Sequence, residues 1–191
     1  MPSQKSNIFI ISGPSGAGED SIIKGLEKHF PIERVITTTT RLMRKGESQG
    51  SPYYFIDKEE FEKKLGNGEF AEHAEEYNEN LYGVTREELE RVRLSGKIGI
   101  WKIEYKGVMT AKKLFPEIKS IYIAAPSLEI LRARIRRRDS VSEEYINERM
   151  EYTKEWIKHE HIYDFRVVNE EGKLEEATKK VADIITTNYK T

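Results

Sequence analysis

The segment ISGPSGAGEDSIIKGL, residues 11–26, has the glycine spacing of a phosphate-binding loop but not its charges. In loops of the form G-x-x-x-x-G-K-[ST], the backbone surrounds nucleotide phosphates, the lysine contacts them and the hydroxyl binds magnesium. Gly13 and Gly18 have this spacing here, whereas Glu19 and Asp20 stand at the lysine and hydroxyl positions. Two acids in a site for polyphosphate require a cation from elsewhere in the chain, or the site has lost this function.

The glycines of this segment leave the backbone able to bind an anion. A residue without Cβ lets successive N–H groups turn inward, and the positive end of a following helix adds to the attraction. The residues that we expect to surround the donor phosphates are Gly13, Ser15, Gly16, Ala17, Gly18, Glu19, Asp20 and Ser21. On this motif alone, GPSGAG could equally be a tight turn between a strand and a helix, because short glycine motifs also match by chance.

The composition excludes several classes of protein. The 191 residues carry 32 basic and 33 acidic side chains, a net charge of −1, so nothing global favours a nucleic-acid or membrane partner. Without cysteine, the chain has no disulfide framework, thiolate zinc site or cysteine nucleophile, which agrees with a reducing cytoplasm. No segment has the apolar length of a signal peptide or a membrane span. We therefore expect a cytoplasmic protein with one compact domain.

Apolar runs alternate with helical patterns along most of the chain, which predicts an α/β fold with a parallel sheet covered on both faces. The expected strands are residues 7–12, 98–103, 120–125 and 164–169. The expected helices are residues 20–30, 108–115, 128–138, one from the N-cap Ser142 toward His159, and one from about Leu174. Ligands bind at the carboxyl ends of the strands in such sheets, where the Gly13 loop lies.

The pattern changes between Thr37 and about Gly96, where short turn-rich pieces such as RKGESQGSPYYF and YNENLYG enclose a helical stretch over 58–65. This region predicts a small subdomain inserted into the α/β domain.

Three later segments give the motif its context. They are TTTTRLMRKGESQGSPYYF (37–55), EFAEHAEEYNENLYG (69–83) and RRRDSVSEEYINERM (136–150). Together with the Gly13 loop and in this order, they make the chain resemble the guanylate kinase family along essentially its whole length. The resemblance implies a P-loop nucleotide kinase fold and transfer of a phosphoryl group from ATP to GMP with Mg²⁺. It implies a core (1–36, 97–136 and 150–191), a GMP-binding subdomain (37–96) and a lid (137–149).

The resemblance also implies a role for each matching residue. It places Arg41, Arg44, Tyr53 and Tyr82 on the GMP phosphate, Glu72 and Thr37 on guanine, Arg134, Arg138 and Arg149 on the transferring phosphates, and Asn169 near the donor base. These residue types suit those tasks. Guanidinium groups and phenols satisfy phosphate oxygens directionally, and a carboxylate accepts both N1–H and N2–H₂ of guanine. Adenine would leave that carboxylate unpaired, at a cost that explains the choice of base.

A second departure from the family lies on IWKIEYKG, where the family has a D-x-D arrangement and this chain has Lys102 and Glu104. Glu104 retains a carboxylate that can help to bind the guanine side. At Lys102 an acid has become a base, on a strand that ends beside the phosphate loop. We interpret this as a charge swap in which Lys102 reaches the donor phosphates and Asp20 ligates magnesium. The alternative is that Lys102 simply pairs with Glu19 in an inactive site.

A rival function is a catalytically inactive module of the same family that binds GMP or a protein partner through the GMP-site face. A kinase with another acceptor is disfavoured by the guanine-binding set. The arginine-rich run 132–139 would suit nucleic acid by itself, but the lid match accounts for it better. His159 and His161 are expected at the surface and not as metal ligands, and Trp101 and Trp156 are expected to pack. The expected partners are GMP and ATP, without nucleic acid or membrane, for a monomer or weak homodimer.

Overall fold

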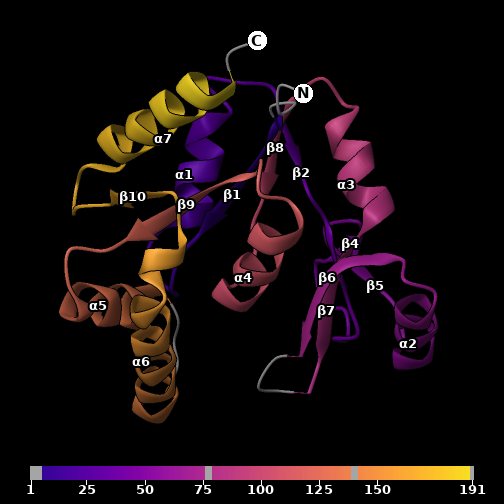
Figure 1. Cartoon of the computed structure of the whole chain (residues 1–191). Coiled ribbons are helices and arrows are strands. Elements are labelled where there is room, and N and C mark those ends of the chain that lie inside the picture. The colour runs from indigo at the N-terminus through magenta and orange to yellow at the C-terminus, as the bar shows by residue number, and fades with distance from the viewer. Residues whose placement is uncertain (1–5, 76–78, 139–141, 190–191) are drawn as a thin grey trace.

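A computed structural model describes residues 6–75, 79–138 and 142–189 of the chain (Figure 1). Its central sheet has five parallel strands in the order β10-β9-β1-β8-β2, which confirms the predicted α/β class. The strands are β1 (Ile8–Ser12), β2 (Ile32–Arg34), β8 (Ile98–Trp101), β9 (Lys119–Ala124) and β10 (Phe165–Val168). The sequence pattern had indicated four of them and missed β2, which has three residues and alternates little.

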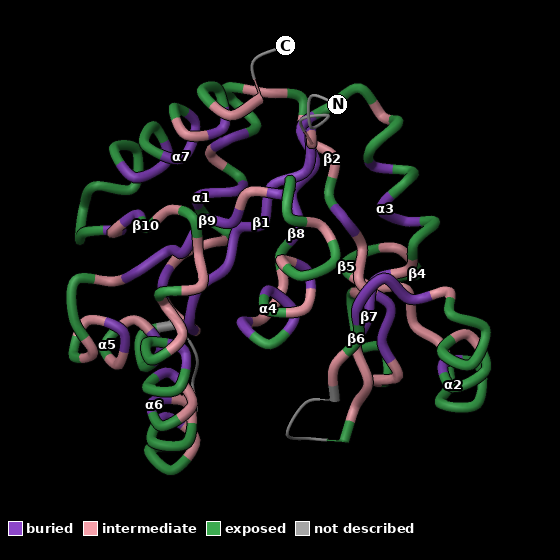
Figure 2. Tube along the Cα trace, viewed as in Figure 1, coloured by how far each residue is buried: buried purple, intermediate pink, exposed green. Residues whose placement is uncertain are grey.

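Helices cover both faces of this sheet because its strands are apolar on both faces (Figure 2). Along β1, Phe9 and Ile11 pack into one cluster with α1, α5, α6 and α7, whereas Ile8 and Ile10 pack into a second cluster with α3 and α4. The helices are α1 (Glu19–Leu26), α3 (Arg86–Arg93), α4 (Tyr105–Leu114), α5 (Leu128–Arg138), α6 (Glu143–Lys158) and α7 (Leu174–Tyr189), with a 3₁₀ turn η1 (Glu160–Ile162). None of the described helices is both long and apolar enough to cross a membrane.

Sequence analysis missed α3, and most other helix boundaries lie near the predicted ones, with two differences. Helix α1 ends at Leu26, where 20–30 had been expected, because the N–H groups of Lys28 and His29 turn back onto nearby carbonyls. Helix α4 begins three residues before the expected Val108, directly after the N-cap Glu104. The predicted N-cap of α6 is present, since the Ser142 side chain accepts a hydrogen bond from Tyr145 N at 3.2 Å.

Residues 37–85 form a second five-stranded sheet in the order β4-β5-β3-β7-β6. Its strands are β3 (Thr37–Thr39), β4 (Ser48–Gln49), β5 (Pro52–Phe55), β6 (Phe70–Glu75) and β7 (Leu81–Thr85), and α2 (Lys58–Gly66) joins β5 to β6. The sequence pattern had indicated only the helix, because strands of two to six residues with polar side chains on both faces give little periodicity. In Figure 1 this sheet lies on the opposite side of α4 from α5 and α6.

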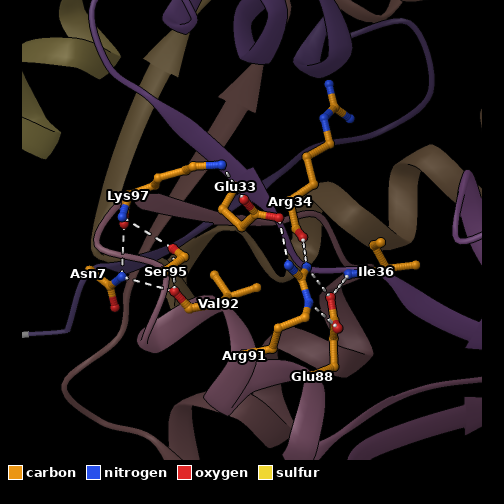
Figure 3. Close-up of polar contacts among 9 residues, drawn as sticks. All are labelled: Asn7, Glu33, Arg34, Ile36, Glu88, Arg91, Val92, Ser95 and Lys97. Atoms are coloured by element: carbon orange, nitrogen blue, oxygen red, sulfur yellow. Dashed lines mark hydrogen bonds and ion pairs between the residues drawn. The ribbon is translucent and has the colours of Figure 1, made fainter.

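The chain passes from one sheet to the other at residues 34–36, and a polar network fixes this crossing to α3 (Figure 3). Glu88 is buried and accepts a hydrogen bond from Ile36 N at 2.7 Å. Arg91 pairs with Glu88 at 2.8 Å and with Glu33 at 2.6 Å, and its Nη2 donates to the carbonyl of Arg34 at 3.0 Å. These hydrogen bonds raise the pKa of Arg91, so the guanidinium stays charged. The network therefore sets the relative position of the two sheets at their junction.

We expect Glu88→Gln to lower the free energy of unfolding by about 1–3 kcal/mol, because it removes the buried charge that Arg91 and Ile36 N contact. Denaturant unfolding followed by circular dichroism measures this change. Glu87→Gln is the matched control, since Glu87 is the exposed neighbour on the same helix. Equal stability of Glu88→Gln and Glu87→Gln would show that the network does not hold the junction.

Candidate functional site

A cavity of about 520 Å³ opens between the two sheets, at the carboxyl ends of β1 and β8. The predicted site residues that line it are Gly13, Ser15, Glu19, Asp20, Thr37, Arg41, Arg44, Tyr53, Glu72, Tyr82, Lys102, Glu104 and Arg149. Residues from opposite ends of the sequence thus share one cavity, because the central sheet delivers the loop and Lys102 while the second sheet delivers the aromatic and arginine side chains.

The loop after β1 requires its glycines. Gly16 and Gly18 have φ angles of 87° and 94°, a left-handed conformation that side chains disfavour, and Gly18 is the N-cap of α1. A Cβ on Gly13 would lie 2.5 Å from the carbonyl oxygen of Ile123, so the loop passes close to β9. Glu19 and Asp20 then form the first turn of α1, where the positive end of the helix faces them. Ser21 is exposed on the same helix.

Two predicted residues lie behind the loop and hold it. Asn169 donates from Nδ2 to the carbonyl of Ala17 at 2.8 Å. Arg134 donates to the carbonyls of Asn169 at 2.8 Å and Gly16 at 3.3 Å, and it pairs with Glu171 at 2.7 Å. Its guanidinium therefore supports the loop in this conformation. Arg138 ends α5, but its side chain lies outside the described residues, as do residues 139–141 of the expected lid.

Lys102 follows β8 and its ammonium reaches the acids of the loop. Its Nζ lies 2.6 Å from Asp20 Oδ2 and 3.5 Å from Glu19 Oε1. Burial raises the pKa of Glu19, and the neighbouring ammonium opposes this shift. Burial works against the charge of Lys102, but the two carboxylates outweigh it and raise the pKa of the ammonium. The cation is thus shared by both acids, with the shorter contact to Asp20.

Sequence analysis missed a second cation at the loop. Arg34, the last residue of β2, has its Nη1 3.8 Å from Asp20 Oδ1. Strand β2 lies next to β8 in the sheet, so both strands end beside the loop. Because β2 was not recognised in the sequence, no pattern placed Arg34 near the phosphate motif.

The second sheet brings an arginine and two tyrosines together at the other end of the cavity. The Arg41 guanidinium carbon lies 5.3 Å from the centre of the Tyr53 ring, which meets the Tyr82 ring edge-on at 5.9 Å. Glu47, which sequence analysis missed, accepts from Arg41 Nη2 at 2.8 Å and from the backbone N–H of Arg44 at 2.7 Å. These hydrogen bonds lower the pKa of Glu47, so it binds Arg41 as an anion.

Glu72 on β6 and Thr37 on β3 line the same cavity. Glu72 is 5% exposed, and its burial raises the pKa of its carboxyl to about 7. Helix α4 approaches it closely, since a Cβ on Gly107 would lie 3.0 Å from Glu72 Oε2. A carboxyl group in this setting can recognise a ligand that offers adjacent N–H donors.

Glu104 contacts α6 through a residue that sequence analysis also missed. The Tyr152 hydroxyl donates a hydrogen bond to Glu104 Oε2. Tyr152 follows Arg149 by three residues, so one face of α6 presents both to the cavity. This spacing was the available signal for Tyr152.

The aromatic residues differ partly from expectation. Trp101 packs in the core as predicted, and Trp156 packs against Tyr105 while also lining the cavity. The expectation of surface positions is correct for His161 but wrong for His159, whose half-buried ring stacks on Tyr105 with centroids 4.6 Å apart. The reason is that α6 ends at Lys158, so His159 turns toward α4.

Comparison with known proteins gives consistent results. A family model described as "Guanylate kinase" matches residues 5–188. The guanylate kinase of Idiomarina loihiensis is 39% identical over 168 residues, which cover 86% of this chain and 80% of the relative. That of Thiobacillus denitrificans is 36% identical over 171 residues, with 89% and 81% coverage. The crystal structure of guanylate kinase from Anaplasma phagocytophilum superposes with a TM-score of 0.73 at 32% identity, over 98% of this chain and 89% of that one.

The raised pKa of Glu72 predicts that this carboxyl lowers the free energy of unfolding as pH rises. The folded protein binds more protons than the unfolded chain between pH 4.5 and about 7, so this contribution to stability is lost as pH rises through 7. Glu72→Gln should therefore be more stable than the wild type by about 1–3 kcal/mol at pH 8.5, and by less than about 1 kcal/mol at pH 5.

Denaturant unfolding at the two pH values measures this difference. Glu62→Gln, on the exposed face of α2, is the control and should differ from the wild type equally at both pH values. A stability difference between Glu72→Gln and the wild type that does not grow from pH 5 to pH 8.5 would contradict the prediction.

Proposed function

The chain belongs to the guanylate kinase family, and we propose on this basis that it transfers the γ-phosphoryl group of ATP to GMP. The observation that carries the proposal is one cavity lined by a phosphate loop, by arginine and tyrosine side chains and by a buried carboxyl. Such an arrangement brings a donor polyphosphate and an acceptor monophosphate close together, which is what phosphoryl transfer requires.

We propose that GMP binds to the second sheet, as a GMP-binding subdomain comprising 37–96. Its phosphate would contact Arg41, Arg44, Tyr53 and Tyr82. Its base would offer N1–H and N2–H₂ to Glu72, O6 to the hydroxyl of Thr37, and one further contact to Glu104. Guanine binding would favour the charged form of Glu72, because its two donors replace the water that burial removed.

ATP would bind along the Gly13 loop, with its base beside Asn169 and its phosphates on the loop N–H groups. Lys102 would supply the charge that the loop lysine supplies elsewhere in the family. Mg²⁺, when bound, neutralises the donor phosphates and is commonly held by one or two carboxylates together with phosphate oxygens. Asp20 fits this requirement, because its side chain is 64% exposed and lines the cavity beside Glu19.

In the reaction, an oxygen of the GMP phosphate attacks the γ-phosphorus in line with the bond to the β–γ bridging oxygen. The new P–O bond forms as that bond breaks, so the products are GDP and ADP, and no side chain forms a covalent intermediate. We propose that Arg134, Arg138 and Arg149 stabilise the charge on the transferring group once a lid (137–149) closes over the core (1–36, 97–136 and 150–191). We further propose a cytoplasmic monomer or weak homodimer.

One observation favours a second candidate, a catalytically inactive module that binds GMP. The Lys102 ammonium is engaged by Asp20 at 2.6 Å and must leave this contact to reach a phosphate. A coupled assay with GMP, AMP, UMP and dGMP against ATP and GTP separates the two functions. Turnover of GMP shows a kinase. GMP binding without turnover with either ATP or GTP shows the binding module.

Lys102→Ala should reduce kcat/KM by an amount equivalent to about 2.7–4 kcal/mol, because it removes a cation aimed at the transferring phosphates. Glu19→Lys alone should not improve the enzyme, since it sets two ammonium groups against each other. The double variant Glu19→Lys with Lys102→Asp should recover part of the lost activity, which a mutant cycle measures. Full activity of Lys102→Ala, or activity that appears only in Glu19→Lys, would contradict the charge swap.

Arg41→Ala should weaken GMP binding by about 1.5–3 kcal/mol, because one charge-assisted contact to phosphate is lost. Isothermal titration calorimetry measures the affinity, and thermal unfolding checks that the fold is kept. Arg93→Ala removes an exposed arginine of α3 and is the matched control. If AMP binds the wild type as tightly as GMP does, the assignment of guanine is incorrect.

A further inference from the structure

We propose that Arg34 is a positioning residue of the phosphate site, which acts through Asp20 and frees Lys102 for the nucleotide. This inference rests on the proposed function and adds to it a residue that the phosphate-loop pattern does not include. It begins from the contacts of a single carboxylate. Lys102 contacts Oδ2 of Asp20 at 2.6 Å, and Arg34 contacts Oδ1 at 3.8 Å.

The pairing of β2 with β8 fixes the backbone positions from which the Arg34 and Lys102 side chains extend. Arg34 is paired with Ile100 across β2 and β8, and the next residue, Val35, donates its N–H to the Ile100 carbonyl at 2.9 Å. The Arg34 carbonyl accepts from Arg91 at 3.0 Å. In Figure 3 the Arg34 side chain points away from this network. Its backbone is therefore held at the sheet junction while its half-exposed guanidinium extends to the loop.

The formal charge of the phosphate site is balanced only when Arg34 is included. A lysine and a hydroxyl in the loop with an acid on the neighbouring strand, as in the family pattern, sum to zero. In formal charge, with both acids ionised, Glu19, Asp20 and Lys102 sum to −1, and Arg34 restores zero. A site with an excess negative charge would repel polyphosphate, so the second cation offsets the second acid of the loop.

The second cation beside Asp20 also explains how Lys102 can leave this carboxylate. Without Arg34, movement of Lys102 to a phosphate would leave Mg²⁺ as the one cation proposed beside the Asp20 carboxylate. With Arg34 3.8 Å from Oδ1, the carboxylate keeps a second cation beside it while Lys102 moves. Arg34 thereby acts on the donor nucleotide through Asp20, without needing to touch it.

The ion pair itself contributes little to folding. The Arg34 and Asp20 side chains are 47% and 64% exposed, and exposed pairs stabilise proteins by about 0–1 kcal/mol. A loss of nucleotide affinity in an Arg34 variant would therefore not follow from lost stability. This separates a positioning role from a merely structural one.

The test compares Arg34→Ala, Arg34→Lys and the control Lys24→Ala, an exposed cation on α1. Titration calorimetry with ADP in the presence of Mg²⁺ is the main readout, and GMP titration and thermal unfolding accompany it. We expect Arg34→Ala to weaken ADP binding about tenfold, because the negative charge of Asp20 beside the phosphates is then less compensated, with GMP affinity and melting temperature kept. Arg34→Lys should recover most of the affinity, and Lys24→Ala should bind ADP like the wild type.

The same Arg34→Ala change is then measured in an Asp20→Asn protein, which tests whether Arg34 acts through Asp20. Once Asp20 carries no charge, adding Arg34→Ala should weaken ADP binding less than about twofold, because the route through the carboxylate is gone. The proposal is overturned if Arg34→Ala changes ADP affinity less than twofold in the wild-type background, if the loss is equal in both backgrounds, or if the wild type binds no ADP. Failure of the wild type to phosphorylate GMP would instead count against the proposed kinase activity, since the ADP titrations still measure the role of Arg34.

Discussion

The contact between Lys102 and Asp20 depends on the pairing of β1 with β8, and the proposed nucleotide site depends on where that pairing places Lys102. Parallel pairing sets Ile10 beside Trp101, so the residue after β8 lies next to the loop that follows β1. In an ordinary phosphate loop the cation belongs to the same short segment as the glycines. Here the loop and its cation are about eighty residues apart in the chain, and only the assembled sheet brings them together.

The second sheet imposes a matching constraint from the other side of the cavity. Thr37, Tyr53 and Tyr82 come from three neighbouring strands, and the β3 pairings align them. This sheet joins the core through residues 34–36, which Glu88 and Arg91 hold against α3. Because Arg34 belongs both to that junction and to the phosphate site, the position of the acceptor sheet and the charge of the donor site share one residue.

The sequence indicated the parts of the fold with strong periodicity and the residues that belong to recognisable motifs. Apolar runs such as IFIIS locate a buried strand directly, and Ser142 marks the start of α6. Strand β2 has three partly exposed residues, and β4 has two, so neither produces a periodic signal. Arg34 was missed because it acts on a residue distant in sequence, which only strand pairing reveals, and Glu47 because its contacts lie within an irregular loop. Tyr152 was missed although its spacing from Arg149 was an available signal.

Glu47 holds Arg41 in an ion pair, so an anion that binds Arg41 must displace the Glu47 carboxylate. Its carboxylate binds Arg41 through both oxygens and also accepts from the backbone of Arg44, so the arginine already has an anionic partner before any ligand arrives. An incoming anion competes with a tethered carboxylate that carries one charge. A singly charged buffer ion gains little by such an exchange, whereas a phosphomonoester brings nearly two charges and more acceptor oxygens. Under the proposed function, the tethered acid would therefore set a threshold that favours the dianion over common monovalent anions.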